Sequence, residues 1–124
     1  MRKKEIRKFF GWGFFLILFF LGHNFLVSIW PVVENRGISW GWGEGFAVWL
    51  AGGIWFILFL GAKRTESFGV KLMLLGGAVN LLDRLIFGTV RDYWQFFGGV
   101  YNNVADFFIG FGLVIFAVEL WKKK

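Results

Sequence analysis

Five polar side chains lie in the second half of a chain that is otherwise strongly apolar: Asn80, Asp83, Arg84, Asp92 and Asp106. An ionisable group at membrane depth costs at least ~2.5–3.5 kcal/mol on insertion scales, so such residues are candidates for a functional site. Asp92 and Asp106 flank one short loop, which can bring their carboxyl groups together. Paired carboxyl groups share one proton, so one can activate water while the other polarises an amide carbonyl. The pattern predicts peptide hydrolysis that needs neither metal nor thiol.

Each of these residues also has a structural interpretation. Asp83 and the neighbouring Arg84 could form an intramembrane ion pair that locks helices together. Asp92 could be a solvated loop acid, and Asp106 could be the N-cap of the helix that follows it, since Asp is favoured there. Asn80 lies three residues before Asp83 and four before Arg84, so one helix face carries all three. Their occurrence together favours a functional site.

The composition predicts a membrane protein. The chain has 124 residues, of which 57% are hydrophobic, with 18 Phe and 8 Trp and a mean hydropathy of +0.61. A bilayer is crossed by about 20 apolar residues in a helix. We therefore expect a single domain, residues 1–124, with four transmembrane helices over residues 9–30, 46–62, 68–90 and 104–121. The basic amino-terminal end resembles a secretory signal peptide, but its long apolar run predicts a retained helix.

The basic residues predict the topology. Eleven of the fourteen Lys and Arg residues fall at the two ends or at one internal turn, which predicts cytoplasmic termini by the positive-inside rule. No basic face interleaved with aromatic residues suggests nucleic-acid binding. The absence of cysteine excludes disulfides and thiol chemistry, and a single histidine, His23, makes a zinc site improbable. We expect no metal and no cofactor.

Helix geometry places the polar residues at one membrane face. At ~1.5 Å per residue, a ~30 Å hydrocarbon core is crossed after about 20 residues, near Phe87 of the third predicted helix. Asn80 and Asp83 then lie in the outer third of the core, and Asp92 lies just beyond it. Asp106 opens the fourth helix from the same side.

Four blocks, in order along the chain, resemble those of signal peptidase II, the bacterial lipoprotein signal peptidases. They are Asn-Arg-Gly-Ile-Ser-Trp-Gly at 35–41, Gly-Gly-Ala-Val-Asn-Leu-Leu-Asp-Arg at 76–84, Val-Arg-Asp-Tyr at 90–93 and Asn-Val-Ala-Asp at 103–106. The chain departs from the family pattern in the length of the excursion after the first predicted helix, which is shorter than usual, and at three sites in its sequence. The outer end of the first helix has His23 and Asn24 where the family usually has an acid, Val79 replaces a glycine, and Asn102 replaces an aromatic residue.

The resemblance implies an all-α membrane protein with four transmembrane helices, both termini cytoplasmic, and a small extracytoplasmic β-like cradle. It implies an intramembrane aspartic endopeptidase of the bacterial inner membrane, monomeric and active at the extracytoplasmic side. Its substrates would be diacylglyceryl-modified prolipoproteins, cut just before the lipidated cysteine among membrane lipids, and globomycin-type cyclic peptides would inhibit it. By the same resemblance, Asp92 and Asp106 are catalytic; the substrate-binding residues are Asn35, Asn80, Arg84 and Asn103, and the supporting residues are Asp83 and Gly37.

Two other functions remain open at this point. One is a transporter or channel subunit in which Asp83, Arg84 and Asp106 form an ion or proton path, which would require oligomers. The other is a non-catalytic relative that only binds lipoproteins.

Overall fold

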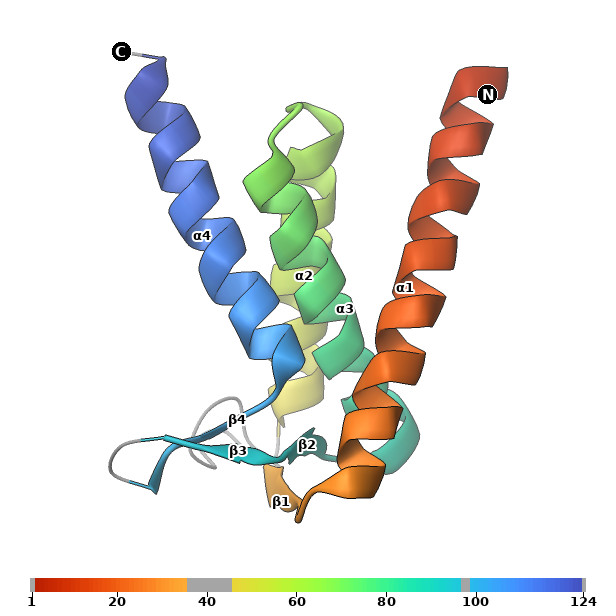
Figure 1. Cartoon of the computed structure of the whole chain (residues 1–124). Coiled ribbons are helices and arrows are strands. Elements are labelled where there is room, and N and C mark those ends of the chain that lie inside the picture. Colours follow the sequence, from red (N-terminus) through yellow and green to blue (C-terminus); the bar gives the residue numbers. More distant parts are fainter. Residues whose placement is uncertain (1, 36–45, 97–98, 124) are drawn as a thin grey trace.

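The computed structural model describes residues 2–35, 46–96 and 99–123. The described part contains four helices and four short strands (Figure 1). Both termini lie at one end of the helices, and the strands lie at the other. In chain order the elements are α1 (Lys3–Ile29), β1 (Val33–Asn35), α2 (Ala47–Lys63), α3 (Phe68–Phe87), β2 (Val90–Asp92), β3 (Trp94–Gln95), β4 (Tyr101–Asn102) and α4 (Val104–Lys122).

The helix bounds differ from the predicted spans by more than one residue at two places. α1 begins at Lys3 rather than residue 9, because Lys and Arg are good helix formers and the apolar run marks only its membrane-compatible part. α3 ends at Phe87 rather than residue 90. Gly88, with φ of 78°, ends it in a left-handed conformation that glycine adopts at little cost. The residues after this cap form β2, so Asp92 belongs to a strand.

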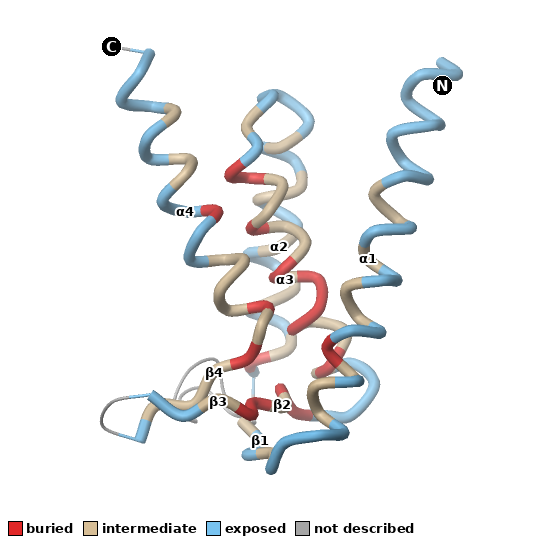
Figure 2. Tube along the Cα trace, viewed as in Figure 1, coloured by how far each residue is buried: buried red, intermediate tan, exposed pale blue. Residues whose placement is uncertain are grey.

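Two helices, α1 and α4, are long and apolar enough to cross a membrane by length and composition, and α2 is a shorter apolar helix of 17 residues. The large apolar side chains of α1 face outward; Phe9 and Phe10, for example, are 67% and 68% exposed. Figure 2 shows α1 exposed over most of its length, with buried residues gathered on α3 and on the strands. Such a continuous exposed apolar surface is expected where lipid covers the protein.

α3 and α4 pack closely because glycines remove the side chains between them. A Cβ atom on Gly112 would lie 2.6 Å from the carbonyl oxygen of Gly69 and 2.8 Å from Met73 Cγ. A Cβ atom on Gly76 would lie 2.5 Å from the carbonyl oxygen of Ala105. Small residues at helix crossings are the usual way in which membrane helices approach each other. This contact sets α3, with Asn80 and Asp83, against the helix that carries Asp106.

We expect Gly112→Ala to destabilise the fold by about 1–3 kcal/mol, because the added methyl group meets backbone atoms that cannot move without separating the helices. Thermal unfolding of the detergent-solubilised protein measures the effect. Gly110→Ala is the matched control: Gly110 lies on the same helix, and an added Cβ there meets nothing within 4 Å. Equal melting temperatures for the two variants would contradict the close α3–α4 contact.

Glu119 also connects α3 and α4, at the end of the helices where the two chain termini lie (Figure 1). Its carboxylate accepts hydrogen bonds from the hydroxyl of Ser67 and from the backbone N–H groups of Phe68 (3.2 Å) and Gly69 (3.3 Å). Ser67 is the N-cap of α3, so a side chain of α4 satisfies donors that the first turn of α3 leaves unpaired. This contact lies at the opposite end of α4 from Asp106.

Two small antiparallel sheets connect the helices at the other end. β1 pairs with β2, placing Val33 opposite Asp92 and Asn35 opposite Val90. β3 pairs with β4, placing Trp94 opposite Asn102. The chain thus passes from α3 through both sheets into α4 within a short distance. This path brings Asp92 to the start of the helix that carries Asp106.

Candidate active site

Asn103 connects the two carboxyl groups that the sequence singled out. Its side-chain amide nitrogen donates to Asp92 Oδ1 at 3.0 Å. Its side-chain oxygen accepts from the backbone N–H of Asp106 at 3.1 Å, and its own backbone N–H donates to Asp106 Oδ2 at 3.0 Å. Asn103 is fully buried. Asp92 and Asp106 therefore meet at one end of the helices, on either side of a single asparagine.

Asn103, rather than Asp106, is the N-cap of α4. Asp106 occupies the third helical position and completes a reciprocal capping box with Asn103. The N-cap role considered for Asp106 is therefore wrong, because its carboxylate contributes to the cap from inside the first turn of the helix. The helix terminus favours negative charge there.

Asn80 reaches the same cluster from α3. Its amide nitrogen donates to Asp106 Oδ1 at 3.1 Å, and its side-chain oxygen accepts from Asn103 at 2.9 Å. Each carboxyl group thus receives one side-chain amide N–H: Asp106 from Asn80 and Asp92 from Asn103. Asn80 is buried, with 8% of its surface exposed.

Asp92 is buried beside other charges, and this changes its titration. Burial is the main reason that the pKa of Asp92 rises from 3.8 to about 7, and the negative charge of Asp106 raises it further. The hydrogen bond from Asn103 and the positive charge of Arg84 oppose the rise. A carboxyl group with a pKa near neutrality can hold or release a proton under working conditions, which suits acid–base catalysis.

Asp83 faces a different set of partners from those predicted. The sequence pairs it with the adjacent Arg84, whereas in the structure Asp83 Oδ1 forms an ion pair with Arg91 Nη2 at 2.7 Å. Its other oxygen lies 2.7 Å from His23 Nε2 and accepts the backbone N–H of Arg91 at 3.0 Å. Adjacent residues on a helix point in directions about 100° apart, so Asp83 and Arg84 do not face each other.

Arg91 and two residues of α1 complete this second cluster, and sequence reasoning gave Arg91 no role. Arg91 Nη2 also donates to Asn24 Oδ1 at 2.6 Å, and its guanidinium group lies 3.9 Å from the centre of the Phe87 ring. His23 has no exposed surface. The signal that could have found this cluster is the adjacent polar pair, His23 and Asn24, within an apolar helix.

The remaining predicted site residues are placed as follows. Arg84 lies in α3 close enough to Asp92 and Asp106 for its charge to act on both. Asn35 ends β1, opposite Val90 in the sheet that carries Asp92. Gly37 lies outside the described residues. Within residues 2–35, 46–96 and 99–123, no three acidic or histidine side chains gather as metal ligands would.

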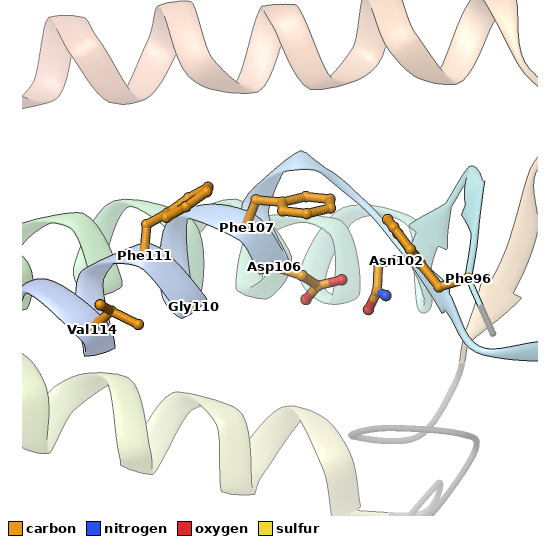
Figure 3. Close-up of a pocket in the computed structure, with 7 residues that line it drawn as sticks. All are labelled: Phe96, Asn102, Asp106, Phe107, Gly110, Phe111 and Val114. Atoms are coloured by element: carbon orange, nitrogen blue, oxygen red, sulfur yellow. The ribbon is translucent and has the colours of Figure 1, made fainter. Parts of the chain in front are cut away.

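A groove of about 430 Å³ runs from Asp106 along α4. Figure 3 shows the polar ends of Asp106 and Asn102 near each other at one end of it, with Phe111 and Val114 further along the helix. The volume falls in the range of small-molecule binding sites. Its wall is mostly apolar and is formed by Phe96, Asn102, Asp106, Phe107, Gly110, Phe111 and Val114.

Comparison with known proteins identifies the family. The family model for signal peptidase (SPase) II matches residues 9–122. The lipoprotein signal peptidase of Thermodesulfovibrio yellowstonii is 30% identical over 129 residues, which cover 88% of this chain and 84% of the relative. That of Solibacter usitatus is 31% identical over 111 residues, which cover 73% of this chain and 66% of the relative.

Two solved structures share the fold. Both are described as a bacterial membrane enzyme structure obtained by the in meso method, one at 2.3 Å and one at 1.9 Å resolution. The first aligns with a TM-score of 0.73 at 16% identity, covering 91% of this chain and 87% of the other. The second aligns with a TM-score of 0.63 at 19% identity, covering 77% and 70%. With a family model that spans nearly all of its residues, the chain belongs to the signal peptidase II family.

Proposed function

We propose that this protein is an intramembrane aspartic endopeptidase that removes the signal peptide from diacylglyceryl-modified prolipoproteins, cutting just before the lipidated cysteine. The observation that carries the proposal is the fully buried Asn103, which hydrogen-bonds both Asp92 and Asp106. Two carboxyl groups held at one site can hydrolyse a peptide bond without a metal or a thiol, because one acts as a general base and the other as a general acid.

The pair acts with one proton between its two members. Asp106 accepts N–H groups from Asn80 and Asn103 and lies at a helix N-terminus, which suits the charged form. Asp92, with its raised pKa, holds the proton. Asp106 takes a proton from water as the water oxygen attacks the carbonyl carbon, and Asp92 gives its proton to the carbonyl oxygen.

The tetrahedral diol then collapses. The carbon–nitrogen bond breaks as Asp106 passes the proton it took from water to the leaving nitrogen. Asp92 recovers its proton from one hydroxyl of the diol as the new carboxyl group forms. The products are the signal peptide and the lipoprotein with a free amino group on its lipidated cysteine, and both aspartates return to their starting states.

The surrounding polar residues have distinct roles in this proposal. Asn80 and Asn103 hold the two carboxyl groups that the substrate backbone would meet. Arg84 supplies positive charge beside the pair, where it can bind a substrate carbonyl. Asn35 ends β1, which we propose as the edge against which the substrate lies. Gly37, from the same sequence block, is proposed only as a supporting residue.

The groove along α4 supports a lipid-bearing substrate. It begins at Asp106 and continues past Phe107, Phe111 and Val114, so an apolar chain can lie along the helix while the peptide bond reaches the carboxyl groups. A lipid anchor next to the scissile bond would hold that bond beside the aspartates. Such positioning makes a bimolecular reaction effectively unimolecular and so lowers its barrier.

We further propose that the protein is a monomer with four transmembrane helices in the bacterial inner membrane. The shared end of the two termini (Figure 1) carries most of the basic residues, which suits the cytoplasmic side. The two small sheets and the aspartate pair would then form the extracytoplasmic cradle and its active site, in contact with membrane lipids.

Purified protein in detergent or lipid tests the proposal with a synthetic prolipoprotein peptide. We expect cleavage of the peptide that carries a diacylglyceryl cysteine, with a single new amino terminus at that cysteine, and inhibition by globomycin. The matched substrate without the lipid should be cut at least tenfold more slowly. Globomycin binding without cleavage would indicate a non-catalytic relative, and ion flux in proteoliposomes that depends on Asp83 would indicate a transporter.

A further inference from the structure

The hydroxyl group of Tyr93 lies between the two segments that carry the aspartates. Tyr93 directly follows Asp92, and its hydroxyl accepts the backbone N–H of Val104, the first residue of α4, at 3.0 Å. The backbone N–H of Tyr93 also donates to the carbonyl oxygen of Asn102 at 3.1 Å. Tyr93 therefore connects the end of β2 to the start of α4 through hydrogen bonds that do not involve the side chain of Asn103.

The same hydroxyl is linked to α1 and α3 through the histidine. The Tyr93 oxygen lies 3.1 Å from His23 Nδ1, and His23 Nε2 lies 2.7 Å from Asp83 Oδ2. All of these groups are buried, and His23 and Asp83 have no exposed surface. Four backbone segments, from α1, α3, the turn after β2 and the start of α4, are thus joined by consecutive hydrogen bonds.

Counting donors and acceptors gives the direction of these bonds. The Asp83 carboxylate, which is ion-paired with Arg91, can only accept, so the imidazole proton lies on Nε2 and is donated to Asp83. Nδ1 of the neutral ring then accepts the hydroxyl proton of Tyr93, whose oxygen also accepts the backbone N–H of Val104. Burial raises the pKa of Tyr93 to about 12, which keeps the hydroxyl proton in place for this bond.

We infer that Asp83, His23 and Tyr93 form a positioning relay that fixes the separation and orientation of Asp92 and Asp106. The relay acts through the backbone on either side of the pair, at Tyr93 and at Val104. None of its three side chains touches the reacting atoms. The inference rests on the proposed two-aspartate peptidase, adds His23 and Tyr93 to its site, and gives Asp83 a defined role.

The burial of His23 supports a specific role. Of the described residues of α1, His23 is the one that is buried. A buried polar group stabilises a fold less well than an apolar one of similar size unless it is fully hydrogen-bonded. Since α1 is mostly apolar from Phe9 onward, an apolar residue at position 23 would serve a membrane anchor as well, whereas the relay requires both ring nitrogens.

Tyr93→Phe removes the relay's central hydroxyl but keeps the ring, which lies against Trp30 and Trp94. We expect kcat on the lipidated peptide to fall roughly 10- to 100-fold with KM within about threefold, because small misplacements of catalytic groups have effects of that size. The matched control is Tyr101→Phe, the same change at the other tyrosine of the chain, in the adjacent β4, which should keep kcat within about twofold.

The pH profile gives a readout that a general loss of stability would not move. If the relay holds the two carboxyl groups together, its loss lets them move apart and weakens the repulsion between their charges. Asp92 then ionises more easily. The pH above which activity falls should therefore be lower in Tyr93→Phe than in the wild type. Tyr101→Phe should leave that pH unchanged. An unshifted profile together with an unchanged kcat in Tyr93→Phe would overturn the relay.

The histidine tests the hydrogen bonds themselves. Glutamine can donate to Asp83 and accept from Tyr93, so His23→Gln should retain at least a third of kcat while His23→Leu loses it; equal loss in both would overturn the inference. Because the chain has one histidine, ¹⁵N-histidine NMR reports the ring directly. We expect the proton on Nε2, with an Nδ1 signal that moves in Tyr93→Phe and stays in Tyr101→Phe.

These readouts separate the relay from the proposed reaction. The NMR result does not depend on catalysis, so a ring proton on Nδ1 would overturn the relay even in an active peptidase. Full cleavage by Asp92→Asn would instead overturn the two-aspartate reaction while leaving the NMR result intact.

Discussion

Replacing Asp106 with asparagine should lower the rate of prolipoprotein cleavage by about 10³-fold or more. The new side chain keeps an oxygen that can accept the backbone N–H of Asn103, so the capping box and the start of α4 should survive. The amide cannot take a proton from water, and loss of general acid–base catalysis costs typically about 10²–10⁴-fold. Initial rates on the diacylglyceryl peptide, measured on purified protein, provide the value.

Asp92→Asn should cause a similar loss, because the proton that it gives to the carbonyl oxygen is then missing. The double variant should be little worse than either single variant, since groups that act as a unit have effects that do not add. If the rate loss in the double variant instead equalled the product of the two single losses, the two aspartates would act independently.

Glu119→Gln provides the matched control for these substitutions. It makes the same change of carboxylate to amide on α4, but at the opposite end, where Glu119 binds Ser67 and the first turn of α3. We expect its activity to stay within about threefold at temperatures below its melting point. More than a tenth of normal activity in Asp106→Asn would contradict the proposed role of Asp106.

The sequence predicted the part of the site that local spacing controls. Asp92 and Asp106 flank one short loop, which predicts that their carboxyl groups come together. From the residues alone, Asp106 is the candidate N-cap, and Asn103, which caps α4 in the structure, is assigned a role only by the family resemblance. Helix geometry placed Asn80 at the matching depth. The structure brings Asn80 and Asn103 into contact with Asp106 and Asn103 into contact with Asp92.

The second cluster depends on contacts that spacing does not encode. His23 and Tyr93 are 70 residues apart, and His23 and Asp83 are 60 apart. Their meeting depends on how α1 leans on α3 and on where the strands turn. Arg91 displaced the expected partner of Asp83 because α3 ends at Phe87 and β2 folds back beside it. A helix continued to residue 90 would have carried Arg91 away.

The largest expected effect on stability is a gain, from Asp92→Asn at neutral and alkaline pH. The folded protein raises the pKa of Asp92 from 3.8 to about 7. Between these two values the unfolded chain has released the proton that the folded protein retains. Stability therefore falls as pH rises through this window, because the folded state binds more protons there.

Above about pH 7 both states are ionised, and the folded protein bears the full cost of a buried charge. Each pKa unit corresponds to about 1.4 kcal/mol, so this rise of about three units means that the buried carboxylate destabilises the fold by roughly 4 kcal/mol. Asparagine has no charge and can still accept the amide proton of Asn103. Asp92→Asn should thus match the wild-type melting temperature near pH 4 and exceed it increasingly up to pH 8.

The Asp106→Asn background supplies the control for this gain. The charge of Asp106 is one cause of the raised pKa of Asp92, so Asp92→Asn should stabilise less when Asp106 is already neutral, as expected for residues in one network. A melting temperature for Asp92→Asn at or below that of the wild type at pH 8 would contradict the buried charge. The expected gain has a functional meaning, since residues selected for catalysis commonly lower the stability of the fold that holds them.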